Sequence, residues 1–450
     1  MKFSKFNIFV KKRNDQYYYL FNTLTGSTFI VDENVKREVE KDNVKYFNEK
    51  ITEEYLEKGI LVKDEVDENR YFDYAFNKAK YFTKSISLTV LLTQDCNLRC
   101  VYCYEGAGER INGSLNDEIR ENIYKFIVNQ VETRNADLVY MVLFGGEPLL
   151  NFRDNVEWLD KIKKYCDDNK KQFVTSIVSN GILFDDFIME KLSEYKCEGI
   201  QITLDGIKNV HDKRRIYKNG KGSFDDVICG INKVRDYVKL PNPVIRINID
   251  KTNLNDTKKL LQYLYDEGIN DCSIDFGIVK DTTQACAGYS DNCLQDDELG
   301  DVLEELHTDM KRIGFCQPNK RPVKRAMFCG MYNDSSFTIS PNGDVYKCWD
   351  HVGYEEHRMG CIDKNGDLSD IQYAYYDWMT FNPLSVKECS ECAYLPVCGG
   401  GCGSISYNKT GSYHSNGCFK VKGVLENEII DYFLRNKEEA KEKELLNENY

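Results

Sequence analysis

The stretch LLTQDCNLRCVYCYEG, residues 91–106, decides how this chain folds and what it can bind. It follows an apolar run and places three cysteines at Cys96, Cys100 and Cys103. Three thiolates this close in sequence can ligate three irons of a [4Fe-4S] cluster and leave the fourth iron without a protein ligand. A tetrahedral zinc site usually draws its ligands from two separated pairs, and no fourth ligand lies nearby. The spacing therefore predicts an iron–sulfur cluster with one open iron.

Composition limits the classes of protein to which this chain can belong. Its 450 residues are enough for one large domain and one or two smaller ones. The net charge of -13 argues against nucleic acid as the main partner, because phosphates would be repelled. With no apolar signal region and no run of eighteen uncharged apolar residues, we expect a cytoplasmic protein without a membrane partner. The 18 cysteines are then expected to be metal ligands and buried thiols.

Strand-like and helix-like segments alternate from about residue 86 onward. A helix between the first two strands would bury Ile119, Ile123, Phe126 and Ile127, with Ser114 as its expected cap. Such β-then-α units predict an α/β fold with a parallel sheet, either open or a partial barrel, and functional residues at the carboxyl ends of the strands. The six predicted strands are residues 85–92, 139–144, 173–178, 199–204, 243–249 and 273–279.

Glycine and polar residues follow three successive predicted strands. Each group alone could be an ordinary turn that closes a strand. All three fall at strand ends, however, where a barrel gathers its ligand contacts. The three groups are Gly145-Gly146-Glu147-Pro148, Ser179-Asn180-Gly181 and Thr203-Leu204-Asp205-Gly206.

The cysteine spacing, with Tyr102 before the third cysteine, and the Gly145–Pro148 element together resemble the radical S-adenosylmethionine (radical SAM) enzymes. The resemblance implies a partial (β/α)6 TIM-like barrel in which the open iron binds SAM, and the reduced cluster cleaves SAM to methionine and a 5'-deoxyadenosyl radical. It further implies that the backbone of this element and Glu147 hold the methionine amino group. The SAM contacts implied in this way are Tyr102, Gly145, Gly146, Glu147, Ser179, Asn180, Thr203 and Arg215, with Arg246 as a weaker choice that could instead form a structural ion pair.

The stretch after the fourth strand narrows the resemblance to the peptide- and protein-modifying branch of this group. It contains Leu204, Asp205, Gly206, His211, Asp212 and Arg215. The cysteine-rich end resembles the SPASM domain, which binds two auxiliary [4Fe-4S] clusters, for three clusters in all. A zinc ribbon would explain four of its cysteines but not all seven. By resemblance, one auxiliary cluster is held by Cys389, Cys392, Cys398 and Cys418, and the other by Cys329, Cys348 and Cys402.

The second of these auxiliary sets is one ligand short. Sulfatase-maturing enzymes have two further cysteines upstream, whereas only Cys329 stands at comparable spacing here. Either an iron is open there, or Cys316 or Cys361 closes the site.

The resemblance divides the chain into five parts. Residues 1–80 resemble in size and order the small winged-helix-like leader-recognition (RRE-like) domain of peptide maturases, whose strand edge pairs with an extended leader peptide. The charged stretch at residues 63–80 is expected to be a linker or an exposed helix. The other parts are the radical SAM barrel at 86–282, a bridge at 283–325, the SPASM domain at 326–422, and a C-terminal helix and tail at 423–450.

These features imply a maturase of a ribosomally made precursor peptide, with an external electron donor such as flavodoxin or ferredoxin. Sulfatase-maturing enzymes place an aspartate base directly after the cysteine, whereas here Trp349 separates Cys348 from Asp350, the tentative base. Thioether formation at a substrate cysteine is the first choice, and carbon–carbon or carbon–oxygen crosslinking the second. An anaerobic sulfatase-maturing enzyme and a non-enzymatic iron–sulfur redox protein remain as alternatives.

Overall fold

A computed structural model describes residues 1–11, 15–106, 113–280, 288–295, 298–315, 324–419, 421 and 423–433. Its centre is a ten-stranded sheet in the order β13-β12-β10-β9-β8-β6-β14-β15-β16-β17. The strands from β13 to β14 are parallel to their neighbours, and the remaining pairs are antiparallel. An α/β fold with a mostly parallel central sheet is thereby confirmed.

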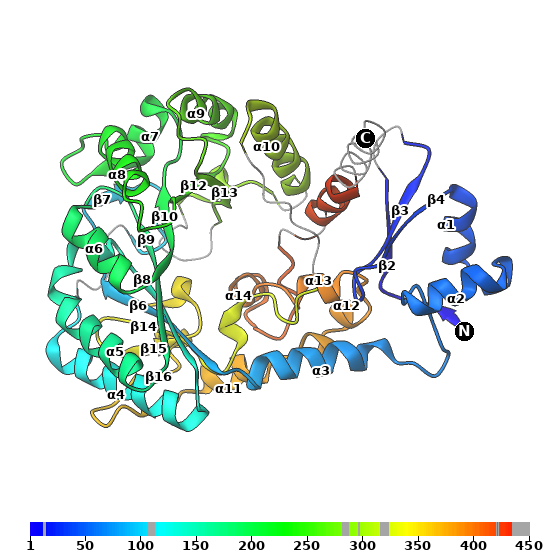
Figure 1. The fold of residues 1–450 in the computed structure, drawn as a ribbon, viewed down its shortest axis with the longest axis horizontal. Helices are drawn as coiled ribbons and strands as arrows, with labels where there is room; N and C mark the ends of the chain where they lie inside the picture. Colours follow the sequence, from blue (N-terminus) through cyan, green and yellow to red (C-terminus); the bar gives the residue numbers. More distant parts are fainter. Residues whose placement is uncertain are drawn as a thin grey trace, which may run out of the picture.

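All six strands predicted from the sequence are present in this sheet. They are β6 (Ser85–Thr93), β8 (Leu138–Gly145), β9 (Gln172–Ser179), β10 (Cys197–Thr203), β12 (Val244–Ile249) and β13 (Ser273–Ile278). The helices line the outer side of the sheet in Figure 1: α4 (Asp117–Arg134), α5 (Val156–Asp168), α6 (Asp186–Glu194), α7 (Lys208–Arg214), α8 (Phe224–Asp236), α9 (Leu254–Asp266) and α10 (Leu299–Ile313). None of the described helices has the length and apolar character needed to cross a membrane.

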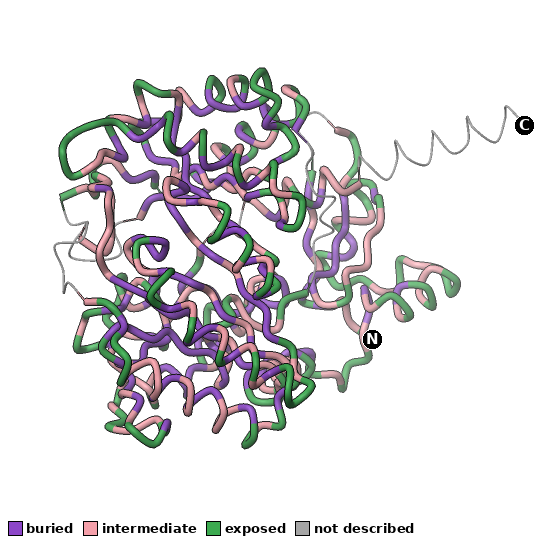
Figure 2. The backbone as a smooth tube through the Cα atoms, turned by 60° about the vertical axis from the view of Figure 1, so that its left-hand side comes forward, coloured by how far each residue is buried: buried purple, intermediate pink, exposed green. Residues whose placement is uncertain are grey.

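Alternating side chains give the sheet two different faces. In β12, Ile245, Ile247 and Ile249 are fully buried in the main core, whereas Arg246 and Asn248 between them point to the other face. Buried segments run through the middle of the molecule, and the outer helices expose one side (Figure 2). The polar face of the sheet is therefore the one available to ligands.

The N-terminal residues form a small sheet of β2 (Asn7–Val10), β3 (Tyr18–Asn22) and β4 (Thr28–Val31), all antiparallel. One face packs on the helices that follow, through Leu20, Val31 and Tyr55. The other face packs on a C-terminal helix at 424–433, through Ile8 and Val10 against Leu425 and Ile429. The remaining elements here are β1 (Lys2–Phe3), α1 (Glu33–Glu40), α2 (Glu49–Glu57), β5 (Leu61–Val62) and α3 (Glu68–Tyr81).

The expectation of a linker or exposed helix before residue 80 is only half right. Helix α3 is present, but Phe72 and Phe76 are fully buried in the same core as the central sheet. Most of the charged residues that suggested exposure lie before or after these two aromatic positions, which are four residues apart and so share one helix face. Helix α3 thus joins the small sheet firmly to the rest of the protein (Figure 1).

The cysteine-rich end continues the central sheet, which the sequence analysis did not predict. Strand β14 (Ser336–Ile339) pairs in parallel with β6, with Phe337 opposite Leu88. The alternation in SFTIS followed by the turn residues Pro341-Asn342-Gly343 was the available signal. The other elements are β15 (Asp344–Tyr346), β16 (Gly360–Ile362), β17 (Leu368–Ser369), α11 (Tyr373–Thr380), α12 (Lys387–Ser390), α13 (Leu395–Cys398) and α14 (Gly403–Thr410).

The expected cap of the first barrel helix was wrong. Asn116 caps α4, and its side chain accepts a hydrogen bond from the amide of Ile119. Ser114 lies two residues earlier and instead donates to the hydroxyl of Thr93 at the end of β6, 2.9 Å away. The first amides of a helix have no carbonyl partner within the helix. The helix therefore begins after Asn116, because this side chain can accept a hydrogen bond from one of those amides.

Candidate active site

The three cysteines of the opening motif lie on one loop after β6, and all three are half-buried. The short strand β7 (Leu98–Cys100) shapes this loop by pairing with β11 (Arg215–Tyr217). Burial, then the charge of Glu147, raises the pKa of the Cys96 thiol to about 12. Because such thiols give up their protons readily only to a metal, a loop of three soft donors beside positive charge fits an iron–sulfur cluster.

The paired glycines let β8 end directly against this loop. The amide of Gly146 donates to the carbonyl of Thr93 at 3.1 Å, and that of Glu147 to the carbonyl of Asp95 at 2.9 Å. A Cβ atom on Gly146 would lie 2.5 Å from the Asp95 carbonyl oxygen, and Gly145 has a φ of 136°. Any larger residue would push the backbone that precedes Cys96.

The buried carboxylate of Glu147 ties this turn to the next strand end. It accepts hydrogen bonds from the hydroxyl of Ser179 at 2.9 Å and the amide of Asn180 at 2.7 Å. The Asn180 side chain in turn donates to Asn97, in the cluster loop, at 2.7 Å. Burial raises the pKa of Glu147, against the pull of these donors. The sequence-predicted residues of two strand ends are thus brought together.

A buried polar network occupies the next strand ends. The hydroxyl of Tyr102 donates to Asp205 and accepts from Arg215, 2.9 Å away. Arg214 donates two hydrogen bonds to Asp250, at 2.8 and 2.7 Å, and lies 3.5 Å from Asp205. The Nε atom of Arg215 is buried and has no partner among the described residues. A spare guanidinium donor beside the cluster loop fits the carboxylate of a bound amino acid such as the methionine part of SAM.

Two predicted SAM contacts differ in their surroundings. Thr203 is buried at the end of β10, next to the network. Arg246 is half-exposed, forms an ion pair with Asp275, and donates to Asn248 at 3.1 Å. The structural ion pair considered for Arg246 is therefore present.

The seven cysteines of the C-terminal part form two groups. The thiols of Cys392, Cys398 and Cys418 are close enough to Cys389 that their charges, after burial, help raise its pKa to about 12. The charges of Asp350, Cys402 and Cys329 act in the same way on Cys348. The members of each group match one of the two sets expected from the sequence, and cluster binding by either set stays a prediction. Among the described residues, no three His, Cys, Asp or Glu side chains converge on a point that could hold a single metal ion.

Cys361 and Cys316 are the two residues considered as a further ligand for the set of Cys329, Cys348 and Cys402. Cys361 lies in β16, with its thiol 3.5 Å from the hydroxyl of Ser369. Cys316 lies outside the described residues.

Two carboxyl groups lie between the cluster loop and Cys348. Burial, with the charge of Asp350 next, raises the pKa of Glu105 to about 7, and one Glu105 oxygen has no partner in the described part of the chain. Burial raises the pKa of Asp350 to about 6. The intervening Trp349 stacks on Phe144 of β8, with ring centroids 5.5 Å apart. This stacking places Trp349 against the barrel strand β8, and the role of Asp350 as a base stays a prediction.

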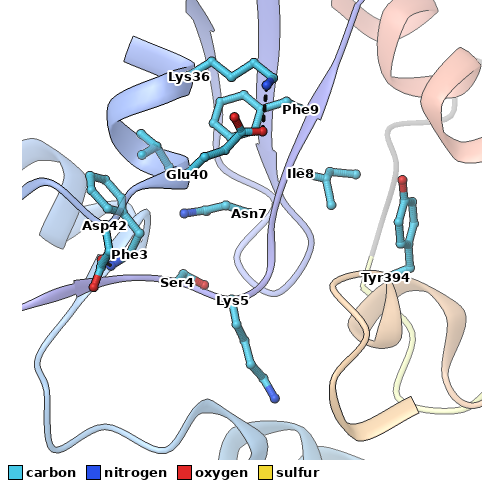
Figure 3. A pocket seen from close by; sticks show the side chains of 11 residues that line it. Phe3, Ser4, Lys5, Asn7, Ile8, Phe9, Lys36, Glu40, Asp42 and Tyr394 are labelled. Atoms are coloured by element: carbon cyan, nitrogen blue, oxygen red, sulfur yellow. Dashed lines mark hydrogen bonds and ion pairs between the residues drawn. The ribbon is translucent and has the colours of Figure 1, made fainter. Parts of the chain in front are cut away.

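A pocket of about 480 Å³ lies beside the small N-terminal sheet (Figure 3). Its lining includes Ile8 and Phe9 of β2, Lys36 and Glu40 of α1, and Tyr394. The Tyr394 hydroxyl donates to Glu426 at 2.5 Å, and the residue stands between Cys392 and Cys398 in sequence. The pocket is therefore lined both by the N-terminal sheet and by the segment that carries one of the cysteine groups.

Residues 90–264, which contain the cluster loop and the strand-end network, match the radical SAM superfamily. The chain contains a radical SAM domain. This domain implies one [4Fe-4S] cluster and SAM, which the donor sets described above fit.

Relatives and solved structures resemble more than this radical SAM domain. The cysteine-type anaerobic sulfatase-maturating enzyme of Clostridium novyi (strain NT) is 24% identical over 345 residues, 71% of this chain and 88% of the relative. The structure of anSMEcpe with bound AdoMet and the Cp18Cys peptide aligns with a TM-score of 0.58 at 19% identity, over 79% of this chain and 99% of that one. Streptococcus suis SuiB bound to precursor peptide SuiA aligns with a TM-score of 0.52 at 16% identity, over 94% of this chain and 99% of that one.

The sequence analysis missed several side chains of this radical SAM site. Arg214 and Asp250 form a buried ion pair, and only the adjacent basic residues Arg214 and Arg215 hinted that one of them points inward. Glu105 follows the motif by two residues, but no spacing rule singles it out. Asn97 and Asn248 bond to the motif residues and would have needed the strand-end geometry to be recognised.

Proposed function

We propose that this radical SAM enzyme matures a ribosomally made precursor peptide and closes a thioether at a substrate cysteine. The observation that carries this proposal is the presence of two further cysteine groups beside the radical SAM site, with a strand edge for an extended peptide on the far side of them. A simple electron carrier would need neither the SAM-site network nor that edge.

The proposed cofactors are SAM and three [4Fe-4S] clusters, with the N-terminal sheet as an RRE-like domain and the C-terminal part as a SPASM domain. One cluster would be held by Cys96, Cys100 and Cys103. The other two sets are Cys389, Cys392, Cys398 and Cys418, and Cys329, Cys348 and Cys402. The grouping of the thiols in space supports this assignment.

The radical SAM cluster with bound SAM would supply the hydrogen-abstracting radical. The chain itself would position SAM through Gly145, Gly146 and the network around Arg215, and would keep water from the reacting atoms. Asp350 is the proposed acceptor of the substrate thiol proton, because it is a buried carboxyl beside Cys348. Closing one thioether removes a hydrogen atom from carbon, which the adenosyl radical would take, and a proton and an electron from the thiol, which Asp350 and an auxiliary cluster would accept, so two hydrogens leave the peptide.

The substrate leader is proposed to add a strand to β2. Thr23 donates its amide to the carbonyl of Phe6, which fixes the register so that the amide and carbonyl of Phe9 face away from β3. The pocket lies along this edge (Figure 3). An extended peptide there would gain backbone hydrogen bonds and could place apolar side chains in the pocket.

Two proline variants test which edge the leader uses. Phe9→Pro removes an outward amide without breaking a β2–β3 hydrogen bond, and Ile30→Pro does the same on the opposite edge strand β4. We expect the first to weaken binding of the leader peptide several-fold, since each backbone hydrogen bond contributes about 1 kcal/mol, and the second to leave it unchanged. Circular dichroism would verify that both fold. Loss of binding in Ile30→Pro alone would move the leader to β4.

The reaction itself is tested by the mass and thiol content of the precursor. Each thioether should lower the mass by about 2 Da and remove one alkylatable thiol. Replacing the substrate cysteine by serine should stop the mass change. Should all thiols remain alkylatable after turnover, carbon–carbon crosslinking would replace thioether formation.

The clusters are tested on the enzyme alone. Anaerobic reconstitution should give on the order of 12 irons per chain. Replacing Cys96, Cys100 and Cys103 together by alanine should remove one cluster and abolish SAM cleavage while retaining the others. SAM cleavage by that triple variant would contradict the assignment.

A sulfatase maturase is the second candidate, favoured by the likeness to the Clostridium novyi enzyme and to anSMEcpe. These matches cover 71% and 79% of this chain, whereas the match to SuiB covers 94%. The wider match supports a precursor peptide as substrate. Turnover of a sulfatase-derived cysteine peptide, without any leader, would favour the second candidate instead.

A further inference from the structure

The segment that carries most of one cysteine group has little regular structure of its own. We call Cys389, Cys392, Cys398 and Cys418 the Cys389 set, and its first three members lie within residues 389–398. Helices α12 and α13 have four residues each, and the four residues between them form neither helix nor strand. Helices this short are not stable by themselves. The conformation of the segment therefore depends on what it contacts and on what its thiols bind.

The same segment forms one wall of the pocket beside the small N-terminal sheet. Tyr394 lines this pocket together with Ile8 and Phe9 of β2. Figure 3 shows Ile8 on the side of β2 that faces Tyr394. Val397, three residues further along, is buried in the same apolar cluster as Ile8. The shape of the pocket thus depends on the path of residues 392–398.

Two hydrogen bonds from the N-terminal part end on main-chain carbonyls of this segment. The Nζ atom of Lys5 donates to the carbonyl of Ser390 at 2.7 Å, and the buried hydroxyl of Thr23 donates to the carbonyl of Ala393 at 2.5 Å. The position of a carbonyl is set by the path of the backbone and not by the identity of the side chain. These contacts therefore form only while the segment keeps this backbone conformation.

Tyr394 is held both by its ring and by its main chain. Its hydroxyl donates to Glu426 of the C-terminal helix at 2.5 Å, and its carbonyl accepts a hydrogen bond from the amide of Cys398 at 2.9 Å. The amide of Leu395 donates to the carbonyl of Cys392 at 3.2 Å. The residue that lines the pocket is therefore part of the turn that sets the spacing between two thiols of the Cys389 set.

The other cysteine group is attached to a different part of the molecule. We call Cys329, Cys348 and Cys402 the Cys348 set. Cys348 follows β15 of the central sheet, and Lys347 before it donates to two carbonyls next to β14 and at its first residue, at 2.7 and 2.6 Å. Asp350, the proposed proton acceptor, lies two residues further along. The contacts thus tie the Cys348 set to the central sheet and the Cys389 set to the pocket.

We propose that the cluster held by the Cys389 set is a structural part of the leader-binding site, so that the enzyme binds the leader of its precursor peptide tightly only when this cluster is in place. The coupling rests on the proposed function, which supplies both the leader at β2 and the cluster at these cysteines. A metal group that binds only the ordered segment stabilises that order, and with it the wall of the pocket. By linkage, a bound leader must in turn make this cluster harder to remove.

Leader binding by the anaerobically reconstituted enzyme tests the coupling. The variant is Cys392→Ala/Cys398→Ala, and the matched control Cys329→Ala/Cys402→Ala removes two thiols of the Cys348 set. The probe is a fluorescein-labelled synthetic peptide with the leader sequence of a short precursor encoded beside this chain, and fluorescence anisotropy measures its affinity. We expect the variant to bind the probe about tenfold or more weakly, and the control to bind it as the wild type does. Iron analysis verifies which cluster is missing, and circular dichroism verifies folding.

A second variant changes the wall of the pocket and keeps every cluster ligand. Tyr394→Ala should retain the iron content of the wild type but bind the probe about fivefold more weakly, because the ring no longer lines the pocket. The matched control is Tyr373→Ala, which removes a tyrosine ring that is 79% exposed on α11 and should leave the affinity unchanged. This pair of variants measures the role of the wall without removing a cluster.

Amide hydrogen exchange gives a readout that needs no peptide. Residues 5–10 and 390–397 should exchange faster in Cys392→Ala/Cys398→Ala than in the wild type, and at the wild-type rate in Cys329→Ala/Cys402→Ala. In that control, which retains the Cys389 set, saturating probe should also slow the release of iron to a chelator. Faster exchange of both segments in both cysteine variants would overturn the coupling, because it would reflect a general loss of structure.

The outcomes separate this coupling from the function on which it depends. Unchanged affinity for the probe in Cys392→Ala/Cys398→Ala, with the iron of the Cys389 set gone, would overturn the coupling and leave the proposed leader site in place. Equal losses of affinity in both cysteine variants, or unchanged affinity in Tyr394→Ala, would overturn it as well. Wild-type enzyme with its full iron content that does not bind the probe would instead refute the proposed leader site, and the coupling with it.

Discussion

Removing the charge of Asp205 tests how the buried network of the radical SAM site is balanced. Asp205→Asn keeps the shape of the side chain but leaves Arg214 with Asp250 as its remaining buried carboxylate partner. Loss of one partner from a buried ion pair costs about 3–5 kcal/mol. An unfolding entropy of about 2.1 cal/mol/K per residue, summed over the chain, gives roughly 0.9 kcal/mol per kelvin. The unfolding midpoint should therefore fall by about 3–5 °C.

Calorimetry of anaerobic enzyme with matched iron content measures this shift. The control Asp236→Asn removes an exposed charge and should move the midpoint by less than about 1 °C. Arg214→Gln should also destabilise the protein, but the double variant with Asp205→Asn should lose less than the sum, because the two groups interact. A midpoint for Asp205→Asn equal to that of the control, or strictly additive losses in the double variant, would refute the proposed charge balance.

Three further substitutions have outcomes that the packing fixes. A methyl group in Gly230→Ala would overlap the carbonyl oxygen of Gly181, so this variant should be poorly soluble or melt several degrees lower. Burial lowers the pKa of Lys80 from 10.5 to about 8, so the unfolded chain binds the proton first as the pH falls, and wild type should lose stability from pH 10.5 down to 8. Burial also lowers the pKa of Lys347, to about 7, so Lys80→Met should lose less stability than wild type over this range, and the exposed-site variant Lys78→Met should behave as wild type in calorimetry. Ile429→Asp would place a charge in the contact between the C-terminal helix and the small sheet, and limited proteolysis should then cut the first sixty residues faster; an unchanged cleavage rate would count against that contact.

The central sheet could be predicted because its strands have a distinctive composition. Buried parallel strands such as residues 85–92 read as apolar, β-branched runs, and the helices between them show the helical period. The strand-end residues followed from the rule that parallel strands end at one edge. Glu147, Ser179 and Asn180 were found in this way, and the structure joins them by hydrogen bonds.

What could not be predicted depends on contacts between distant segments. The family resemblance singled out Arg215, but only the fold shows that Arg214 binds Asp250 and that Arg215 donates to Tyr102. Helix α3 looked exposed because charges dominate its sequence, and its two buried phenylalanines gain meaning only beside the central sheet. Strand β14 is short, so its sequence pattern is a weak indication of a strand, and its pairing with β6 decides its structure.

Because the first strands pack against the last described helix, one face of the small sheet is covered only late in the synthesis of this protein. Ile8, Val10 and Phe21 leave the ribosome early, but Leu425 and Ile429, which cover them, follow roughly four hundred residues later. At about 5–20 residues per second, one apolar face of the small sheet waits roughly 20–80 s for its cover. A nascent chain in this state offers an exposed sheet to chaperones, and a premature stop codon near the 3' end of the message would leave that exposure permanent at the opposite end of the polypeptide.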